Sequence, residues 1–432
     1  MITYADVLVE NFSPGVMKRL GLGHEEMMRM NPKLVYVSMP AFASDDEEYA
    51  HLKGFEGTIL ATSGVFTDMG LNRQLMGDTT SYSPLYQAST YAAALCAASV
   101  VSALYKREST NLGDRIEVPL ASALLDALVY NAVDVENMPP RYKSMRQMEI
   151  GRRQKQGLPM DLKYEDIDRF LDPFYATYMC KDDRPFYLVA PSHWKHQQRT
   201  LKLLGLWDEF VKLGLPIDKT LVYKNWNGDV KSALGTYPIS DPKWIKALKT
   251  KMKERFKTRD AAEWTILFGA SKIPAHGTLT TKEWMKSRHA ISSGLVKRVN
   301  LEDQTTEMLI PGPFSWCDRA VVPCTEKSRQ DVKDGDEARM KKSANDKEWL
   351  SGINIVDLCN VIAGPIISHT LCRFGCDVVK VDMGTPSYDA SITTLLGLPA
   401  NRGKRSVRLF LSLSPVSQHF LSNSTNQEHR YC

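Results

Sequence analysis

The sequence lacks long apolar runs, a clear excess of one charge and a dense set of cysteines. No run reaches the ~18 apolar residues that a membrane-spanning helix needs. The first residues do not form the basic and then apolar segment of a secretory signal. Lys and Arg number 55 and Asp and Glu number 50, which leaves a net charge of +5. This excess is too small to indicate nucleic acid as a partner, and it suits an anionic small molecule.

Eight cysteines are spread over 432 residues without a C-x-x-C pair. We therefore expect reduced thiols and no metal site. Cys372 and Cys376 lie four residues apart on a predicted helix, where buried packing is the expected role. We predict a cytoplasmic location, with the mitochondrial matrix and the peroxisome as alternatives, and neither a membrane nor nucleic acid as a partner.

The order of the predicted elements is typical of an α/β protein with parallel strands. Residues 5–10 and 34–39 are predicted strands with a helix between them. Residues 89–108 are predicted to form a long helix with Ser89 as its N-cap. Its small side chains indicate that it is buried. Residues 353–381 repeat the order strand, helix, strand.

Shifts in composition divide the chain into five segments. Residues 325–349 contain 14 charged residues in 25, which is typical of an exposed linker. The predicted segments are 1–165, the first part of a large α/β domain; 166–315, a smaller α+β domain; 316–350, a charged linker; 351–411, a second α/β segment; and 412–432, a disordered tail.

Two groups of polar residues are candidates for chemistry. Asn401–Ser406 places three cations around Gly403, an arrangement that suits phosphate groups. Asp78 follows Gly77 in a loop before the long helix, where a carboxylate is a candidate nucleophile, with an ordinary turn residue as the alternative. His193 and His196 have no evident third metal ligand and are expected at the surface or in packing.

The turn of the 353–381 unit does not fit a dinucleotide site. It is Ala363–Pro365, without the G-x-G-x-x-G pattern, and proline has no amide to face a pyrophosphate. A nicotinamide or flavin is therefore not expected. The residues alone indicate an α/β protein with an anionic ligand and leave its function open.

Several motifs are shared with one enzyme family. Asp6–Gly15 is DVLVENFSPG, and RLG follows at Arg19–Gly21. Ile353–Lys380 holds a strand, an AGP turn and a helix, and Asn401–Ser406 is NRGKRS. Together these motifs resemble the family III CoA-transferases (the CaiB/BaiF family), which include formyl-CoA transferase and α-methylacyl-CoA racemase.

The resemblance implies a large domain with a Rossmann-like parallel sheet, split here between chain start and chain end, and a smaller α+β domain. In the family the AGP and NRGKRS segments precede DVLVENF, whereas here they follow it. An internal fragment of a tandem-repeat member, a circular permutant and an incomplete gene model are the three hypotheses that fit. We place the tandem fragment first.

The resemblance also implies an activity. The enzyme would move CoA between an acyl-CoA and a carboxylic acid through an aspartyl anhydride and an enzyme thioester, with Asp78 as nucleophile. The ungapped family register instead places Ser89 at the nucleophile position. Two alternatives are an α-methylacyl-CoA racemase and a non-catalytic CoA-binding half of a tandem enzyme. Phe55 stands where racemases have a histidine, which favours transfer over racemisation.

By the same resemblance, no metal or permanently bound cofactor is implied, and coenzyme A enters as part of the substrate. A homodimer, or an intramolecular pseudo-dimer with a second copy, is implied as the assembly. Ile362 stands where the formyl enzyme has glutamine, so oxalate and formate are not indicated, and no motif reports the acyl group. The residues expected to contact CoA are Asn11, Phe12, Arg19, Lys53, Lys404 and Arg405.

Overall fold

The computed structural model groups the chain into two compact units. Unit 1 holds residues 1–175, 190–249 and 342–432, and unit 2 holds residues 176–189 and 250–341. Unit 1 thus includes residues 190–249, which the sequence analysis assigned to the smaller domain. The structure describes residues 2–67, 71–77, 80, 82–133, 136–137, 143, 145–191, 193–217, 234–235, 239, 241–300, 307–311, 348–383, 397–409 and 429–430.

The first sheet of unit 1 is parallel and has the order β1-β2-β3. Its strands are β1 (Val7–Glu10), β2 (Val35–Ser38) and β3 (Arg115–Glu117), with Val7 opposite Val35 and Tyr36 opposite Arg115. Residues 35–37 of the central strand are buried, as expected for a parallel strand covered on both faces. A short 3-10 helix (Ile2–Tyr4) precedes β1, and the helices α1 (Val16–Arg19) and α2 (His24–Met30) connect β1 to β2.

Helix α5 (Gln87–Thr110) packs on this sheet and contributes to its core. Ala92, Cys96 and Ala103 pack there with the valines of β2, because small side chains let a helix approach a sheet closely. The helix ends at Asn111 in the left-handed region, with φ 58°. Two further helices, α3 (Glu56–Thr62) and α6 (Leu120–Ala127), pack against its first turns through Ile59, Leu60, Ala88 and Leu124.

Helix α5 itself differs from the sequence expectation in two ways. Its outer face is exposed at Val101 and Tyr105, so the helix is buried on one side only. By length and composition, α5 is also the one helix in the described part of the chain that could cross a membrane. A core helix passes the same test, and α5 supplies part of the core. The expectation of no membrane partner stays a prediction.

The second sheet of unit 1 comes from the other end of the chain. Parallel strands β9 (Asn354–Asp357), β10 (Asp377–Met383) and β11 (Arg405–Leu409) form it, with β12 (His429–Arg430) added antiparallel to β11. Helix α15 (Ala363–Arg373) connects β9 to β10. It begins at Ala363, three residues before the predicted start, because proline is tolerated in a first helical turn. β12 falls within the segment predicted to be disordered.

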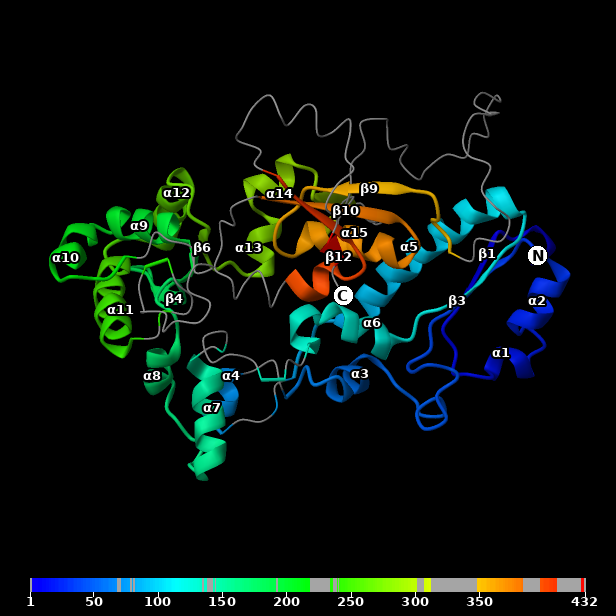
Figure 1. The fold of residues 1–432 in the computed structure, drawn as a ribbon, viewed down its shortest axis with the longest axis horizontal. Helices are drawn as coiled ribbons and strands as arrows, with labels where there is room; N and C mark the ends of the chain where they lie inside the picture. The colour runs from blue at the N-terminus through cyan, green and yellow to red at the C-terminus, as the bar shows by residue number, and fades with distance from the viewer. Residues whose placement is uncertain are drawn as a thin grey trace. The chain divides into compact units, whose positions relative to one another are not determined.

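The two ends of the chain meet within unit 1, where β9, β10 and α15 (orange) lie beside α5 (cyan) in Figure 1. The indole Nε1 of Trp349 donates to Asp114 at 2.8 Å, and its ring packs on the core of the first sheet. Arg373 of α15 pairs with Asp126 of α6 at 2.8 Å. The predicted α/β class with parallel strands is confirmed. The strands form two sheets rather than one, since β9 and β1 each end their own sheet.

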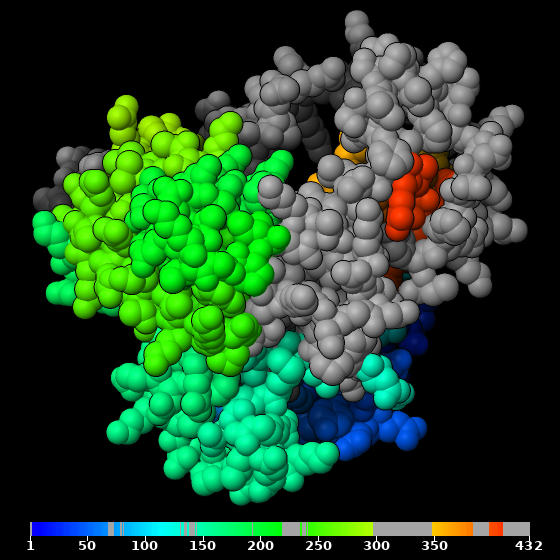
Figure 2. Space-filling model, turned by 60° about the vertical axis from the view of Figure 1, so that its left-hand side comes forward, coloured from blue at the N-terminus to red at the C-terminus, as the bar shows by residue number. Residues whose placement is uncertain are grey.

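The remaining helices of unit 1 form smaller clusters. In one of them Leu75, Ile150 and Ile167 pack together. On α7, which lies in the teal region of Figure 2, Arg152 and Arg153 both bind Glu149. The elements are α4 (Leu71–Leu75), a 3-10 turn (Val129–Ala132), α7 (Met145–Gln156), α8 (Tyr164–Ile167), a 3-10 turn (Asp168–Phe170), α9 (Trp194–Leu203) and α10 (Trp207–Lys212).

Unit 2 is built around a three-stranded sheet and an aromatic core. The ring of Phe256 stacks on Tyr178 with centroids 4.6 Å apart and also contacts Phe186, Trp264 and Phe268. Its elements, some of which start in unit 1, are β4 (Tyr175–Met179), β5 (Pro185–Val189), α11 (Pro242–Phe256), α12 (Ala261–Ala270), β6 (Ala275–Gly277), α13 (Thr281–Met285), α14 (Arg288–Ser292), β7 (Val296–Asn300) and β8 (Glu307–Pro311).

The expected linker, residues 316–350, lies outside the described residues except for its last three. Residues 412–428 of the predicted disordered tail also lie outside the described residues. The five cysteines that the structure describes have free thiols, in agreement with the prediction from the sequence.

Replacing Phe256 by alanine should lower the free energy of unfolding of unit 2 by about 3–5 kcal/mol, because the change empties the centre of a fully buried aromatic cluster. Denaturant unfolding followed by near-ultraviolet circular dichroism measures it. Ile266→Ala is the control, since Ile266 is 72% exposed on α12 and should change stability by less than about 1 kcal/mol. Equal losses in the two variants would contradict this core.

Candidate functional site

The N-terminus of α5 holds a carboxylate from another element. Glu56, in the first turn of α3, accepts hydrogen bonds from the Ala88 amide at 2.8 Å and the Ser89 amide at 2.9 Å. It also accepts one from the Ser89 hydroxyl at 2.6 Å. The first amides of a helix have no partner inside the helix and carry a partial positive charge, so a carboxylate is stabilised there.

This contact changes the role expected for Ser89. The helix begins at Gln87, two residues before the predicted N-cap, and the side chain of Tyr86 at the cap position makes no capping hydrogen bond. Glu56 caps the helix in its place. The amides of Gln87 and Thr90 bond to the Leu85 and Tyr86 carbonyls, so the amides of residues 87–90 all have partners. An anion arriving at this helix end would have to displace Glu56.

The predicted nucleophile Asp78 lies outside the described residues. The residue before it, Gly77, has φ +84°, and a Cβ there would lie 2.5 Å from the Met160 carbonyl oxygen. Only glycine fits such a position without strain. The backbone therefore turns sharply just before Asp78, and the role of Asp78 stays a prediction.

Four of the residues expected to contact CoA are exposed. Asn11 and Phe12 follow the carboxyl end of β1, and Arg19 ends α1. Lys53 stands three residues before α3. Ligands of open parallel sheets bind at the carboxyl ends of the strands, so Asn11 and Phe12 are placed where a ligand is expected. Their contacts with CoA stay predictions.

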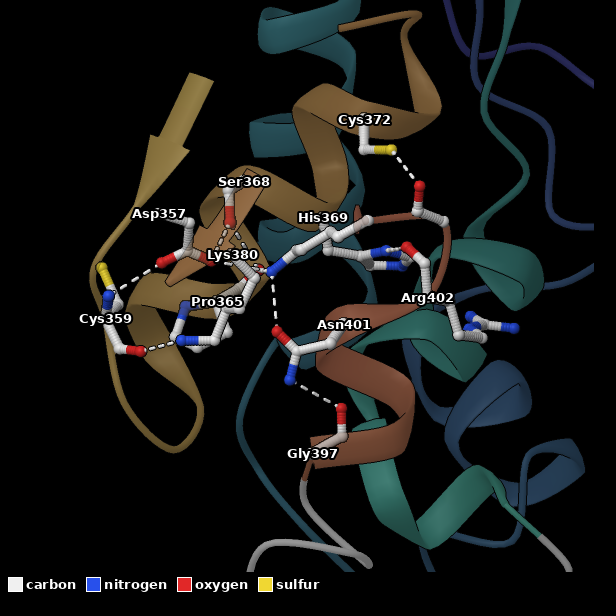
Figure 3. Close-up of polar contacts among 12 residues, drawn as sticks. Asp357, Cys359, Pro365, Ser368, His369, Cys372, Lys380, Gly397, Asn401 and Arg402 are labelled. Carbon is white, nitrogen blue, oxygen red and sulfur yellow. Dashed lines mark hydrogen bonds and ion pairs between the residues drawn. The ribbon is translucent and has the colours of Figure 1, made fainter. Parts of the chain in front are cut away.

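Lys404, expected to contact CoA, is fully buried beneath α15. Its ammonium donates to Asp357 at 2.9 Å, to the Pro365 carbonyl at 2.7 Å and to Asn401 at 3.0 Å. Figure 3 shows Asp357 at the end of β9, Pro365 in the first turn of α15 and Asn401 on a separate helical turn. A lysine has three protons to donate, and all are used. Contact with a phosphate would require this network to open.

The buried Asp357 carboxylate remains ionised. Burial alone would raise its pKa. Hydrogen bonds from the Ser368 hydroxyl, the Cys359 amide and Lys404 outweigh that effect and bring the pKa of Asp357 down to about 2. Asp357 ends β9 and Lys404 directly precedes β11, and these strands lie on either side of β10. Through the bond from Lys404 to the Pro365 carbonyl, the pair connects both strands to the first turn of α15.

The two arginines of the NRGKRS segment lie nearer the surface. Arg405 binds both oxygens of Asp377 at 3.0 and 2.6 Å. Arg402 is exposed, and its guanidinium has no hydrogen-bond or ion-pair partner among the residues that the structure describes. The three cations that the sequence presents as one cluster thus have three different roles. Lys404 is internal, Arg405 is paired at the surface, and Arg402 is available.

The predicted CoA contacts come from both sheets of unit 1. Asn11, Phe12 and Arg19 belong to the first sheet and its helix, whereas Lys404 and Arg405 belong to the second sheet. The contact between Glu56 and α5 could not be read from the sequence. A glutamate that begins a short helix is a common feature, so its partner on α5 had no local signal.

His193 and His196 lie together, with ring centroids 4.6 Å apart. Burial, then nearby cations, lowers the pKa of His193, and burial is also the main cause of the lowered pKa of His196. Across the described ranges, no group of three His, Cys, Asp or Glu residues could hold a metal ion. The packing role predicted for these histidines agrees with the stacking.

Comparison with known proteins places this geometry in context. A family model described as CoA-transferase family III matches residues 1–320 and 350–420. The CoA-transferase/lyase DddD of Marinomonas sp. (strain MWYL1) is 40% identical over 426 residues, which cover 94% of this chain and 50% of that protein. The α-methylacyl-CoA racemase of Mus musculus is 25% identical over 291 residues, covering 67% of this chain and 63% of that one. The chain therefore spans about half to two-thirds of the length of these relatives.

A solved structure supports the fold alone. The orthorhombic crystal structure of Rv3272 from M. tuberculosis aligns with a TM-score of 0.50 and 18% sequence identity, covering 73% of this chain and 71% of that chain. The mixed α/β arrangement is thus shared with a known protein structure, while the identity is too low to transfer any property of its site.

Removing one partner of the buried pair should be costly. Asp357→Asn or Lys404→Met alone should lower the free energy of unfolding by about 3–5 kcal/mol, because each leaves a buried group without its partner. The double variant should lose less than the sum of the two single losses. Below pH 4 the wild type should lose the contribution of Asp357, since its folded pKa lies below the ordinary ~3.9 and its stabilisation disappears as pH falls toward 2. Denaturant unfolding between pH 7 and 2.5 measures both effects.

The control is Asp377→Asn, which removes the exposed pair with Arg405 and should cost no more than about 1 kcal/mol. Strictly additive losses in the double variant, or an unchanged pH dependence in Asp357→Asn, would contradict the buried pair.

Proposed function

The chain belongs to CoA-transferase family III, and on this basis we propose that it moves CoA between an acyl-CoA and a carboxylic acid. The observation that carries the proposal is the match to the family model over residues 1–320 and 350–420. The exposed position of Asn11 and Phe12 at the carboxyl end of β1 supports it, since this is where a nucleotide-containing substrate binds an open sheet.

The proposed nucleophile is Asp78. Its carboxylate attacks the thioester carbonyl, and CoA leaves as thiolate to give a mixed aspartyl–acyl anhydride. The thiolate then attacks the aspartyl carbonyl, which releases the first carboxylate and leaves an aspartyl–CoA thioester. The acceptor carboxylate attacks this thioester, and the thiolate returns to the acyl carbonyl to form the new acyl-CoA and free Asp78. Each step exchanges one acyl bond for another, so the thioester's energy is conserved.

A second candidate function is favoured by a specific contact. In the ungapped family register, Ser89 occupies the position of the nucleophile. Its hydroxyl donates to the Glu56 carboxylate, which also accepts hydrogen bonds from the Ala88 and Ser89 amides of α5. A serine in that position cannot form an acyl anhydride. The second candidate is therefore a non-catalytic CoA-binding half of a tandem enzyme. Racemisation is not favoured, because Phe55 occupies the histidine position and has no proton to exchange.

The assembly and the cellular location belong to the proposal as well. We propose a homodimer, or a pseudo-dimer with a second copy in a tandem protein, with no permanently bound cofactor, in the cytoplasm. The two separate matches to one family model support the tandem hypothesis.

The test is to trap the enzyme thioester. The full chain is incubated with acetyl-, propionyl- or butyryl-CoA and a second short acid, and the products and the intact protein mass are measured. We expect a covalent CoA adduct that maps to Asp78 and is discharged by hydroxylamine. Asp78→Asn should abolish the adduct and lower transfer by at least about 10³-fold, as for loss of a covalent nucleophile.

Asp45→Asn is the matched control, since Asp45 is an exposed loop aspartate, and it should transfer at the wild-type rate. Ser89→Asp separates the two candidates. If CoA binds the wild type without an adduct and an adduct appears only in Ser89→Asp, the second candidate is supported and Asp78 is rejected.

A further inference from the structure

A cavity of about 280 Å³ lies where the two ends of the chain meet in unit 1. Its walls come from α5, α6 and the turn after α6 on one side, and from α15 and residues 399–402 on the other. The apolar part of the wall includes Leu125, Val129 and Ile366. The volume is at the lower end of the range for ligand sites, so it admits a small molecule and excludes CoA.

One carboxylate faces this cavity, and its charge is already balanced. Arg373 donates to Asp126 Oδ1 at 2.8 Å, and the Tyr91 hydroxyl donates to Oδ2 at 2.9 Å. Burial, reinforced by the bond to Asp126, raises the pKa of Tyr91 to about 12, so the hydroxyl stays protonated as a donor. Asp126 therefore has no unbalanced charge to attract a cationic ligand.

The unbalanced charge in the wall is positive. The guanidinium of Arg402 lines the cavity and, within the described ranges, meets no carboxylate. Its backbone is held in place because the Arg402 carbonyl accepts a hydrogen bond from His369 Nδ1 at 3.1 Å. Arg402 can therefore offer two parallel N–H groups to one carboxylate, the geometry for which a guanidinium is suited.

The wall also contains an acceptor that lacks a donor. His369 is 94% buried, and its Nε2 has no hydrogen-bond partner among the residues that the structure describes. A carbonyl can only accept, so Nδ1 must carry the proton in the bond to Arg402. Burial lowers the pKa of His369, so the ring is neutral near pH 7 and Nε2 is an unprotonated acceptor. A buried acceptor without a partner destabilises the protein unless a ligand supplies the donor.

We propose that this cavity binds a short-chain hydroxycarboxylate. Its carboxylate pairs with Arg402, its hydroxyl donates to His369 Nε2, and its carbon chain packs on the apolar wall. An inorganic phosphate fits less well, because its second charge would face Asp126 and it has no apolar part. An amine would meet Arg373 and Arg402. The site goes beyond the proposed transfer reaction, since none of its residues belongs to the proposed nucleophile or CoA contacts.

Calorimetric titration of the full chain at pH 7.5 tests the proposal, with 3-hydroxybutyrate as the main probe. We expect saturable binding of 3-hydroxybutyrate and at least about 5-fold weaker binding of butyrate, n-butylamine and phosphate. Arg402→Gln, at an exposed position where folding is not at risk, should weaken the binding of 3-hydroxybutyrate by at least about 10-fold. The affinity for 3-hydroxybutyrate should then be close to that for butyrate. Arg288→Gln is the matched control, because Arg288 is an exposed arginine of unit 2, and it should bind as the wild type does.

His369→Phe should reduce the preference for 3-hydroxybutyrate over butyrate to less than 2-fold, because it removes the acceptor and keeps the ring. Binding that is equal in Arg402→Gln and wild type, or phosphate binding as tight as 3-hydroxybutyrate, would overturn the proposal, as would no binding to the folded chain. Asp78→Asn distinguishes this site from the transfer site. It should leave 3-hydroxybutyrate binding unchanged even if the transfer proposal fails, and loss of binding in that variant would place the acid at the transfer site.

Discussion

The described part of unit 1 depends on contacts between segments that lie far apart in the chain, and the Asp126 carboxylate joins three of these segments. Asp126 of α6 binds Arg373 of α15 at 2.8 Å, although 247 residues separate them, and it also accepts from Tyr91 of α5. With the bond from Trp349 to Asp114, this contact holds the second sheet against the helices of the first. The NRGKRS segment, and Arg402 within it, reach the wall of the cavity only through this packing.

A second constraint is that two of the charges described in unit 1 are balanced within the protein itself. The Glu56 carboxylate accepts hydrogen bonds from the N-terminal amides of α5, and Asp357 forms an ion pair with the buried Lys404. Each is a site where an anionic or cationic ligand would otherwise bind. Among the described residues, the candidate groups that stay exposed are Asn11, Phe12, Arg19, Lys53 and, at the cavity, Arg402. Family membership supports the proposed CoA transfer. The contact between Glu56 and Ser89 favours the second candidate, a non-catalytic CoA-binding half.

Local patterns predicted the elements well. Short apolar runs predicted the strands at 7–10, 35–38 and 354–357 to within one or two residues, and the small-residue helix at 89–108 is α5 (Gln87–Thr110). Periodicity could not show that the parallel strands form two sheets, because strand pairing depends on contacts across hundreds of residues. The NRGKRS cluster shows the same limit. Three adjacent cations look equivalent in sequence, yet the fold buries Lys404, pairs Arg405 and exposes Arg402. Asp126 is a lone charge in an apolar helix, and its partner could not be read from the sequence.

The central structural claim is that the two ends of the chain pack together in unit 1. A double-mutant cycle on Asp126→Asn and Arg373→Met, measured by denaturant unfolding of the full chain, tests it most directly. Because Arg373 is partly exposed, we expect the two losses to be non-additive by about 0.5–1 kcal/mol, with the coupling reduced at high salt. Additive losses, unchanged by salt, would show that the two segments do not touch and would contradict both this packing and the cavity that it forms.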